Sequence, residues 1–265
     1  MGFMKGKKIL ITGIANRYSL AFGIAKAMHA QNATLALTYH LDKMKEKVCS
    51  LAKKLGISLV FPCDVSSDES IKQLFLNISK KWKKFDGFVH SIAFSKKNQM
   101  SGDYITSITR SDFCRVHDIS SYSFVGMAKE CRSMLKKNSS LVTLSYIGAK
   151  AVIPNYNVMG VAKASLESNV RYMANSMGID NIRVNAISSS PMKTLSSYGI
   201  KNFKEILKFS NAIAPYGSSV TMQDIGNTAA FLCSNLSKGI TGQTIYVDGG
   251  FNITAMNKLN KINNP

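Results

Sequence analysis

The chain has 265 residues, of which 45% are hydrophobic, so it can bury the core of one large domain or two small ones. Its formal net charge is +19, but 28 of its 34 basic residues are lysines spread without an arginine-rich run, which argues against nucleic-acid recognition. No apolar run approaches the ~18 to 20 residues of a membrane span, and the N-terminus lacks a signal-peptide pattern, so we expect no membrane partner.

Short apolar runs alternate with amphipathic segments along the chain, which is typical of strands that are covered on both faces. The predicted strands are residues 7–12, 33–39, 58–62, 85–93, 140–146, 181–188 and 242–250. The predicted helices are residues 19–30, 42–55, 68–82, 109–137, 156–178 and 221–235. This alternation predicts an α/β fold, a Rossmann-like doubly wound sheet of seven parallel strands with helices on both faces, in a single domain over residues 1–265.

Residues 189–220 interrupt this rhythm between the sixth strand and the last helix. A connection of this length in a compact fold is usually a lid or a binding loop with short helices of its own. We therefore expect an insertion here that covers a ligand.

The first predicted strand runs into "TGIANRYSLAFG", where Gly13, Ser19 and Gly23 mark the turn into the first helix. The pattern is not GxGxxG, although a glycine at such a turn lets backbone N–H groups approach a pyrophosphate at the helix N-terminus. A plain turn before an amphipathic helix would need similar residues. The turn alone is thus compatible with dinucleotide binding without requiring it.

The ends of the second and third strands leave the choice of dinucleotide open. The second ends in "TYHLDK", with His40 and Lys43 where an acidic residue would bind a ribose 2′-hydroxyl. These residues would tolerate a 2′-phosphate, or they are simply a solvated helix N-terminus. Asp64, after the third strand, is placed either to bind the adenine edge or to cap its turn.

Polar side chains occur at the end of the fifth predicted strand, which finishes with Ser145 and Tyr146. The predicted helix after that strand carries Tyr156 and Lys163. Positions i and i+7 of a helix return to nearly the same face, about 10 Å apart along its axis. Two tyrosines and a lysine are therefore expected at the carboxyl edge of the sheet, where open α/β sheets bind ligands.

The cysteines are odd in number and scattered, and none is in CxxC spacing. They are Cys49, Cys63, Cys114, Cys131 and Cys233. This argues against a disulfide framework and a zinc site, so we expect a reducing, cytoplasmic location and no metal.

Several motifs together resemble the short-chain dehydrogenase/reductase superfamily and, within it, the family of bacterial NADH-dependent enoyl-acyl-carrier-protein reductases. They are "GKKILITGIANRYSLAFGIA", "KFDGFVHSIAF", "VHDISSYSFVGMAKECRSML", "IPNYNVMGVAKASLESNVRYMAN" and "VDGGF". The resemblance runs from Met1 to about Met256. Its most specific feature is the Tyr-x6-Lys spacing, since ordinary members of the superfamily have Tyr and Lys four residues apart.

The resemblance implies reduction of the trans-2 double bond of enoyl chains on acyl carrier protein during type II fatty-acid elongation. Tyr156 would hydrogen-bond the developing enolate, and Lys163 would hold the nicotinamide ribose. Tyr146 would be the second active-site tyrosine. The cofactor would be NADH, with NADPH not excluded, and a homotetramer is implied by the resemblance alone.

The resemblance also implies which residues contact the ligands. Cofactor contacts are expected at Gly13, Ser19, Leu20, His40, Asp64, Val65, Ile92, Lys163, Met192, Lys193, Thr194, Leu195 and Ser196. The substrate is expected to contact Ser95, and the loop of residues 189–220 would place its apolar side chains against the acyl tail: Met192, Leu195, Tyr198, Ile200, Phe203 and Ile206. Ordinary packing of a short helix would use the same apolar residues. Three lysines, Lys201, Lys204 and Lys208, are expected on one helix face, where they would dock the acidic carrier protein.

The sequence departs from the family pattern at three positions. Ala93 and Ser190 occupy places where relatives often have glycine, and His40 replaces a neutral polar residue. If the backbone at Ser190 needs a positive φ, cofactor binding weakens by roughly 1 kcal/mol. Two other functions stay open: a carbonyl-reducing short-chain dehydrogenase, and a non-catalytic dinucleotide-binding protein.

Overall fold

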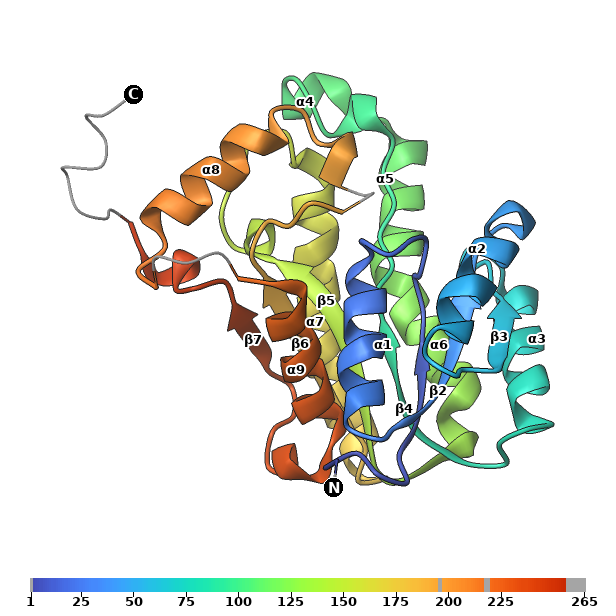
Figure 1. Ribbon diagram of the computed structural model, residues 1–265. Coiled ribbons are helices and arrows are strands. Elements are labelled where there is room, and N and C mark those ends of the chain that lie inside the picture. The colour runs from blue at the N-terminus through green and yellow to red at the C-terminus, as the bar shows by residue number, and fades with distance from the viewer. Residues whose placement is uncertain (1, 195–196, 217–219, 256–265) are drawn as a thin grey trace.

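The computed structural model describes residues 2–194, 197–216 and 220–255. Within these residues, seven parallel strands form one sheet in the order β3-β2-β1-β4-β5-β6-β7 (Figure 1). The strands are β1 Lys8–Ile11, β2 Thr34–Tyr39, β3 Leu59–Pro62, β4 Phe85–His90, β5 Leu135–Tyr146, β6 Arg183–Ser189 and β7 Thr244–Val247. The order reverses between β1 and β4, as in a doubly wound sheet, so the predicted fold class is confirmed.

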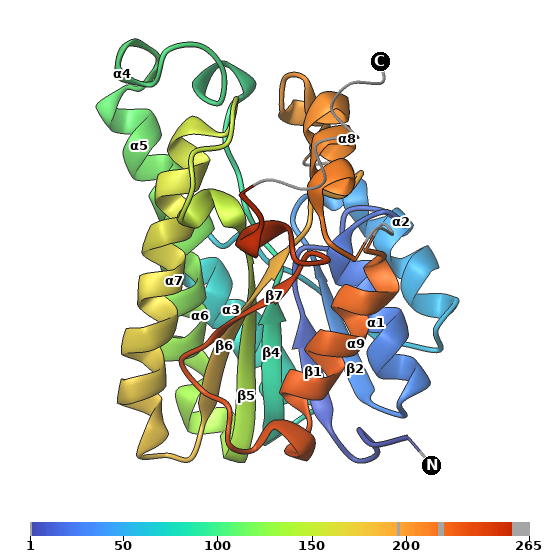
Figure 2. The ribbon, with the colours of Figure 1, turned by 90° about the vertical axis from the view of Figure 1, so that its left-hand side faces the viewer.

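Helices cover both faces of the sheet, and each layer has its own apolar core (Figure 2). One layer holds α1 Leu20–Ala30, α2 Asp42–Lys53 and α9 Met222–Cys233. The other holds α3 Asp68–Ser79, α6 Ser123–Cys131 and α7 Asn157–Gly178. Burial on both sides explains why most strands read as continuous apolar runs rather than as alternating patterns.

Three further helices lie beyond the carboxyl edge of the sheet (Figure 1): α4 Tyr104–Ser107, α5 Arg110–His117 and α8 Phe203–Ile213. Of these, α8 lies in the segment between β6 and α9, where short helices were expected. These helices and their connecting segments therefore cover the carboxyl edge of the sheet.

The predicted helix over residues 109–137 is wrong in its length and its continuity. The segment contains α5, a π-helical turn over Asp118–Tyr122, α6 and a 3₁₀ turn over Arg132–Met134. The chain then enters β5 at Leu135, which pairs with Phe85 of β4. Helical periodicity in a sequence does not reveal where pairing with a distant strand takes over.

The last predicted strand, residues 242–250, is also too long. β7 ends at Val247, because Gly249 and Gly250 adopt positive φ angles of 66° and 85° and turn the chain away. The remaining short helical turns are 3₁₀ turns, at Lys97–Gln99, Ile147–Ala149, Asn235–Ser237, Ser197–Gly199 and Phe251–Ile253. In the part of the chain that is described, no helix has the length and apolarity to cross a membrane.

Candidate active site

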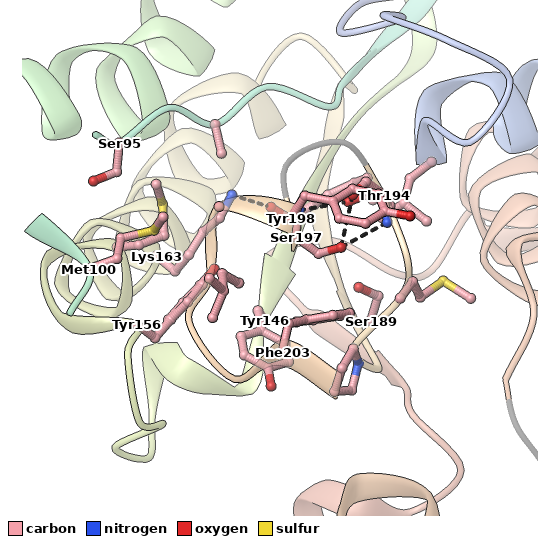
Figure 3. Close-up of a pocket in the computed structure, with 18 of the residues that line it drawn as sticks. Ser95, Met100, Tyr146, Tyr156, Lys163, Ser189, Thr194, Ser197, Tyr198 and Phe203 are labelled. Carbon is pink, nitrogen blue, oxygen red and sulfur yellow. Dashed lines mark hydrogen bonds between the residues drawn. The ribbon is translucent and has the colours of Figure 1, made fainter. Parts of the chain in front are cut away.

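A cavity of about 510 Å³ opens at the carboxyl edge of the sheet (Figure 3). Its walls come from the turn between β1 and α1, the segment after β4, the end of β5, the start of α7 and the segment from β6 to α8. Many of the predicted site residues line it: Gly13, Ser19, Leu20, Ile92, Ser95, Tyr146, Tyr156, Lys163, Met192 and Thr194. One cavity thus brings together residues that are far apart in the sequence, from Gly13 to Ile206.

The two predicted tyrosines meet in this cavity. Tyr146 is the last residue of β5, and Tyr156 directly precedes α7. Their ring centroids lie 5.0 Å apart with the planes at 74°, an edge-to-face contact. Burial raises the pKa of each phenol above its ordinary value, so both stay protonated and can donate a hydrogen bond at neutral pH.

Two glycines make room for the Tyr156 ring. A Cβ atom on Gly148 would lie 2.5 Å from Cδ1 of Tyr156, and one on Gly160 would lie 2.7 Å from the carbonyl oxygen of Gly148. Asn155 and Asn157, on either side of the tyrosine, have positive φ angles of 60° and 30°. The local backbone is therefore specialised to present this one side chain.

Lys163 lies two turns into α7 and is 5% exposed. Its Nζ donates a hydrogen bond of 2.7 Å to the carbonyl oxygen of Leu144, which fixes the ammonium beside the end of β5. Burial lowers the pKa of Lys163 to about 8, while the carboxylate of Glu167 acts to raise it. The ammonium is thus close to losing its proton at mildly alkaline pH.

The turn before α1 has the properties of an anion site. The Oγ of Ser19 accepts hydrogen bonds of 3.0 Å from the backbone N–H groups of Ala15 and Asn16. Helix α1 has no side-chain cap and no acidic residue in its first turn, so its positive end is available to a ligand. Gly13 has a φ of 86°, and a Cβ there would lie 1.9 Å from the carbonyl oxygen of Ser91. These residues fit the pyrophosphate of a dinucleotide.

Three predicted cofactor residues, His40, Asp64 and Val65, are not part of the cavity wall. Nε2 of His40 lies 3.6 Å from Oδ1 of Asp64, and both side chains are about half exposed. Asp64 accepts hydrogen bonds from the backbone N–H and the hydroxyl of Ser66. Of the two roles considered for Asp64, adenine binding and capping of its turn, these bonds correspond to capping. Burial acts to raise the pKa of Asp64, but the bonds from Ser66 and the field of His40 lower it overall.

The segment after β6 supplies much of the apolar wall. Met192, Tyr198, Ile200, Phe203 and Ile206 line the cavity, where the resemblance places residues that would contact the acyl tail. Leu195 and Ser196 lie outside the described residues, and Lys193 is not part of the wall.

Two of the predicted docking lysines, Lys204 and Lys208, are exposed one turn apart on α8. Lys201 lies in the turn before that helix, because α8 begins at Phe203. The expectation that all three lysines share one helix face is therefore wrong for Lys201.

The strain expected at Ser190 does not occur. Among the described residues, the non-glycine positions with positive φ are all asparagines, so Ser190 has an ordinary backbone conformation. Its N–H donates to the carbonyl oxygen of Val247 at 3.0 Å. Because Ser190 does not need a positive φ, the weakening of cofactor binding that such a φ would cause is not expected. Ala93, the other departure, lines the cavity.

Sequence patterns did not identify several residues that hold the tyrosines. Met100, Ile153 and Met159 pack in one small core with Tyr146 and Tyr156. Met159 lies on the predicted helix and could have been found from its periodicity. Met100 directly follows the 3₁₀ turn of Lys97–Gln99, where no local pattern signals a contact with α7.

Comparisons with known proteins agree with this geometry. Residues 13–252 match the family described as "Enoyl-(Acyl carrier protein) reductase". The chain is 72% identical to the enoyl-[acyl-carrier-protein] reductase [NADH] of Buchnera aphidicola subsp. Baizongia pistaciae, covering 97% of this chain and 98% of that one. It is 57% identical to the Escherichia coli protein of the same name, with 98% and 99% covered.

Solved structures are similar over nearly the whole chain. The enoyl-[acyl-carrier-protein] reductase (NADH) of Aquifex aeolicus superposes with a TM-score of 0.94 at 42% identity, covering 97% of this chain and 100% of that one. The reductase of Anaplasma phagocytophilum in complex with NAD superposes with a TM-score of 0.92 at 41% identity, covering 97% and 96%. With sequence, fold and cavity in agreement, the chain belongs to the enoyl-acyl-carrier-protein reductase family.

Proposed function

We propose that this chain reduces the trans-2 double bond of enoyl chains carried on acyl carrier protein, with NADH as the reductant, in type II fatty-acid elongation. The observation that carries the proposal is the meeting of Tyr146, Tyr156 and Lys163 in one cavity of a member of this family. NADH, when bound, supplies the hydride that the C3 carbon of the substrate receives.

The cofactor is held along the carboxyl edge of the sheet. The turn of Gly13, Ser19 and Leu20 binds the pyrophosphate, because α1 offers it unpaired N–H groups and a positive helix end. Lys163 binds the ribose hydroxyls next to the nicotinamide. Asp64 and Val65 would hold the adenosine half, and Met192 and Thr194, which line the cavity, would contact the nicotinamide half.

The protein assists the reaction by stabilising negative charge on the substrate. Addition of hydride at C3 would place negative charge on the thioester oxygen, three atoms away. Tyr156 donates a hydrogen bond to that oxygen, and its raised pKa keeps it a donor rather than an anion. The ammonium of Lys163 adds a favourable field, since a buried charge acts strongly at short range.

The choice between NADH and NADPH depends on the end of β2. His40 lies 3.6 Å from Asp64, whose carboxylate would repel a 2′-phosphate, so we expect NADH to be preferred. The test is the loss of absorbance at 340 nm with crotonyl thioester and each cofactor in parallel. Faster turnover with NADPH would contradict the preference. Reduction of acetoacetyl thioester but not of crotonyl thioester would instead identify a carbonyl reductase.

Acyl carrier protein is acidic, and the exposed lysines beside the cavity form a complementary surface. Lys204 and Lys208 lie on α8, the helix whose Phe203 and Ile206 line the cavity wall. We expect Lys204→Glu with Lys208→Glu to raise KM for the carrier-linked substrate at least tenfold at low salt, and to leave KM for a small uncharged thioester unchanged.

The matched control reverses two lysines far from the cavity, Lys72→Glu with Lys80→Glu, on and just after α3. Equal KM values for the carrier-linked substrate in both double variants would reject docking on α8.

We also propose a cytoplasmic homotetramer. All five cysteines are free, which suits a reducing compartment. Val161 and Tyr172 are exposed apolar residues about three turns apart on α7, and an interface between copies of the chain would cover them.

A further inference from the structure

Behind the cavity, between β5 and α7, lies an acidic side chain that the proposed reaction does not use. Glu167 is 5% exposed, and its Oε1 accepts a hydrogen bond of 2.6 Å from the hydroxyl of Ser145. Removing a carboxylate from water costs several kcal/mol unless charges or hydrogen bonds compensate for it. Glu167 is therefore expected to have a charged partner as well as a hydroxyl.

The candidate partner is Lys163, one helical turn earlier on the same face of α7, although the ion pairs found among the described residues include no direct contact between the two side chains. The two side chains are joined through adjacent residues of β5, because Lys163 bonds the carbonyl oxygen of Leu144 and Glu167 bonds the hydroxyl of Ser145. Glu167 is also the acidic group whose field acts on the ammonium of Lys163. Two other cations are close to Glu167 and largely exposed: its field acts on Lys150, and Nη1 of Arg171 donates to its backbone carbonyl oxygen at 3.1 Å.

Among the described residues, the other titratable groups around Lys163, His90 and the two tyrosines, carry no compensating charge. His90 of β4 is fully buried between the hydroxyls of Ser123 and Thr143, at 2.8 Å and 3.2 Å from its ring nitrogens. Burial, together with the field of Lys163, lowers the pKa of His90 to about 3, so the imidazole is neutral. Tyr146 and Tyr156 are neutral as well, as described above.

We propose that Glu167 is a positioning residue that keeps the ammonium of Lys163 charged beside the end of β5, where Leu144 holds it and where the cofactor ribose and the substrate would meet it. The proposal rests on the role proposed above for Lys163. Glu167 itself touches neither cofactor nor substrate, since it is absent from the cavity wall. It acts through Lys163 and Ser145.

Burial and the charge of Glu167 act on the pKa of Lys163 in opposite directions. Burial lowers the pKa of Lys163 to about 8, so the charged form is complete well below that pH and is lost as pH rises through it. Removing the negative charge of Glu167 takes away the group that opposes burial. The titration of Lys163 then moves to lower pH, by about one unit for a nearby buried charge.

The test uses Glu167→Gln, which keeps the size of the side chain and an oxygen that can accept from Ser145. In the cofactor-free protein, the titration of Lys163 is followed by NMR of lysine labelled with ¹³C at Cε, and the signal is assigned with Lys163→Met. In the enzyme, the alkaline limb of kcat/KM for NADH reports the same group. Both midpoints are expected to fall by about one pH unit.

Two further variants separate charge from structure. Glu130→Gln on α6 removes an exposed carboxylate and is expected to leave both midpoints in place. Glu167→Asp keeps the charge at a greater distance and is expected to give an intermediate midpoint. If Glu167→Gln does not fold, the Asp variant carries the test.

An unchanged NMR midpoint in folded Glu167→Gln, or in folded Glu167→Asp when the Gln variant fails, would overturn the proposal. A lowered NMR midpoint in a protein that reduces no enoyl thioester would support the Glu167–Lys163 coupling and reject the proposed function. The two failures are therefore distinguishable.

Discussion

At the scale of single residues, the position of Tyr156 depends on neighbours that have no side chain. The ring of Tyr156 occupies space that a methyl group on Gly148 would fill, and Gly160 lets the backbone at Gly148 approach α7. The edge-to-face contact with Tyr146 completes this setting. A hydrogen-bond donor for an enolate has to be held within a fraction of an ångström of its place.

Gly148→Ala is expected to displace the Tyr156 ring, because its Cβ would lie 2.5 Å from Cδ1 of that ring. Since a shift of about 1 Å can lower a rate 10²-fold, kcat for crotonyl thioester should fall by between ~10-fold and ~100-fold. The affinity for NADH, measured by fluorescence, should change far less.

Gly178→Ala is the matched control, since a methyl group at that end of α7 meets nothing within 4 Å. Equal kcat values in the two variants would contradict the positioning role of Gly148.

At this scale, the sequence predicts those site residues whose relation depends only on their spacing along the chain. Tyr156 and Lys163 could be paired from their spacing of seven residues, and both line the cavity although Tyr156 is the residue before α7 rather than part of it. The contacts of Gly148, Met100 and Glu167 could not be predicted, because they depend on how separate segments pack in space. The positive φ that would have strained Ser190 does not occur, and the N–H of Ser190 donates to the carbonyl oxygen of Val247 on the neighbouring strand.

At the scale of elements, one buried carboxylate joins three strands at the amino edge of the sheet. Asp86 of β4 is 6% exposed and accepts from the backbone N–H of Lys8 in β1 at 2.9 Å. Its Oδ2 also lies 2.9 Å from Nζ of Lys136 in β5, and its Oδ1 lies 3.6 Å from Nζ of Lys7. The edge opposite the cavity is thus held by charge as well as by the apolar core.

Asp86→Asn should lower the free energy of unfolding by about 3 kcal/mol, because it leaves partly buried ammonium groups without their anion. Urea denaturation measures the difference. The control is Asp180→Asn, which breaks a pair with Arg132 in which both side chains are more than 40% exposed. That change should cost under about 1 kcal/mol. A similar loss of unfolding free energy in the two variants would contradict the prediction that the buried ion pairs of Asp86 stabilise the fold more than the exposed pair of Asp180.

The strands and most helices of this fold could be predicted from the sequence. Strands that are covered on both faces give continuous apolar runs, and helices that are covered on one face give apolar residues at helical spacing. Right-handed crossovers fix the face of the sheet on which each connecting helix lies, whereas the order of the strands is seen only in the structure. The break of the helix predicted over residues 109–137 could not be seen, since its π-helical turn and the entry into β5 depend on pairing with β4. The boundaries of α8 likewise depend on what its apolar face packs against.

At the scale of the whole molecule, the net charge of +19 does not identify the site. The cavity wall contains Lys97 and Lys163 but is otherwise uncharged and mainly apolar, and most lysines lie elsewhere on the surface. The fold explains the location instead, because parallel strands end together at the edge where the two tyrosines, the lysine and the N-terminus of α1 converge.

The most direct test is the turnover of crotonyl thioester with NADH by the native chain and by Tyr156→Phe, with NADH binding measured on both. Loss of a single donor to a developing oxyanion lowers kcat by roughly 10²- to 10³-fold. We predict a loss of this size with NADH affinity retained, because Phe keeps the ring and its contact with Tyr146. Turnover of the variant at the native rate would contradict the role of Tyr156 and, with it, the proposed mechanism.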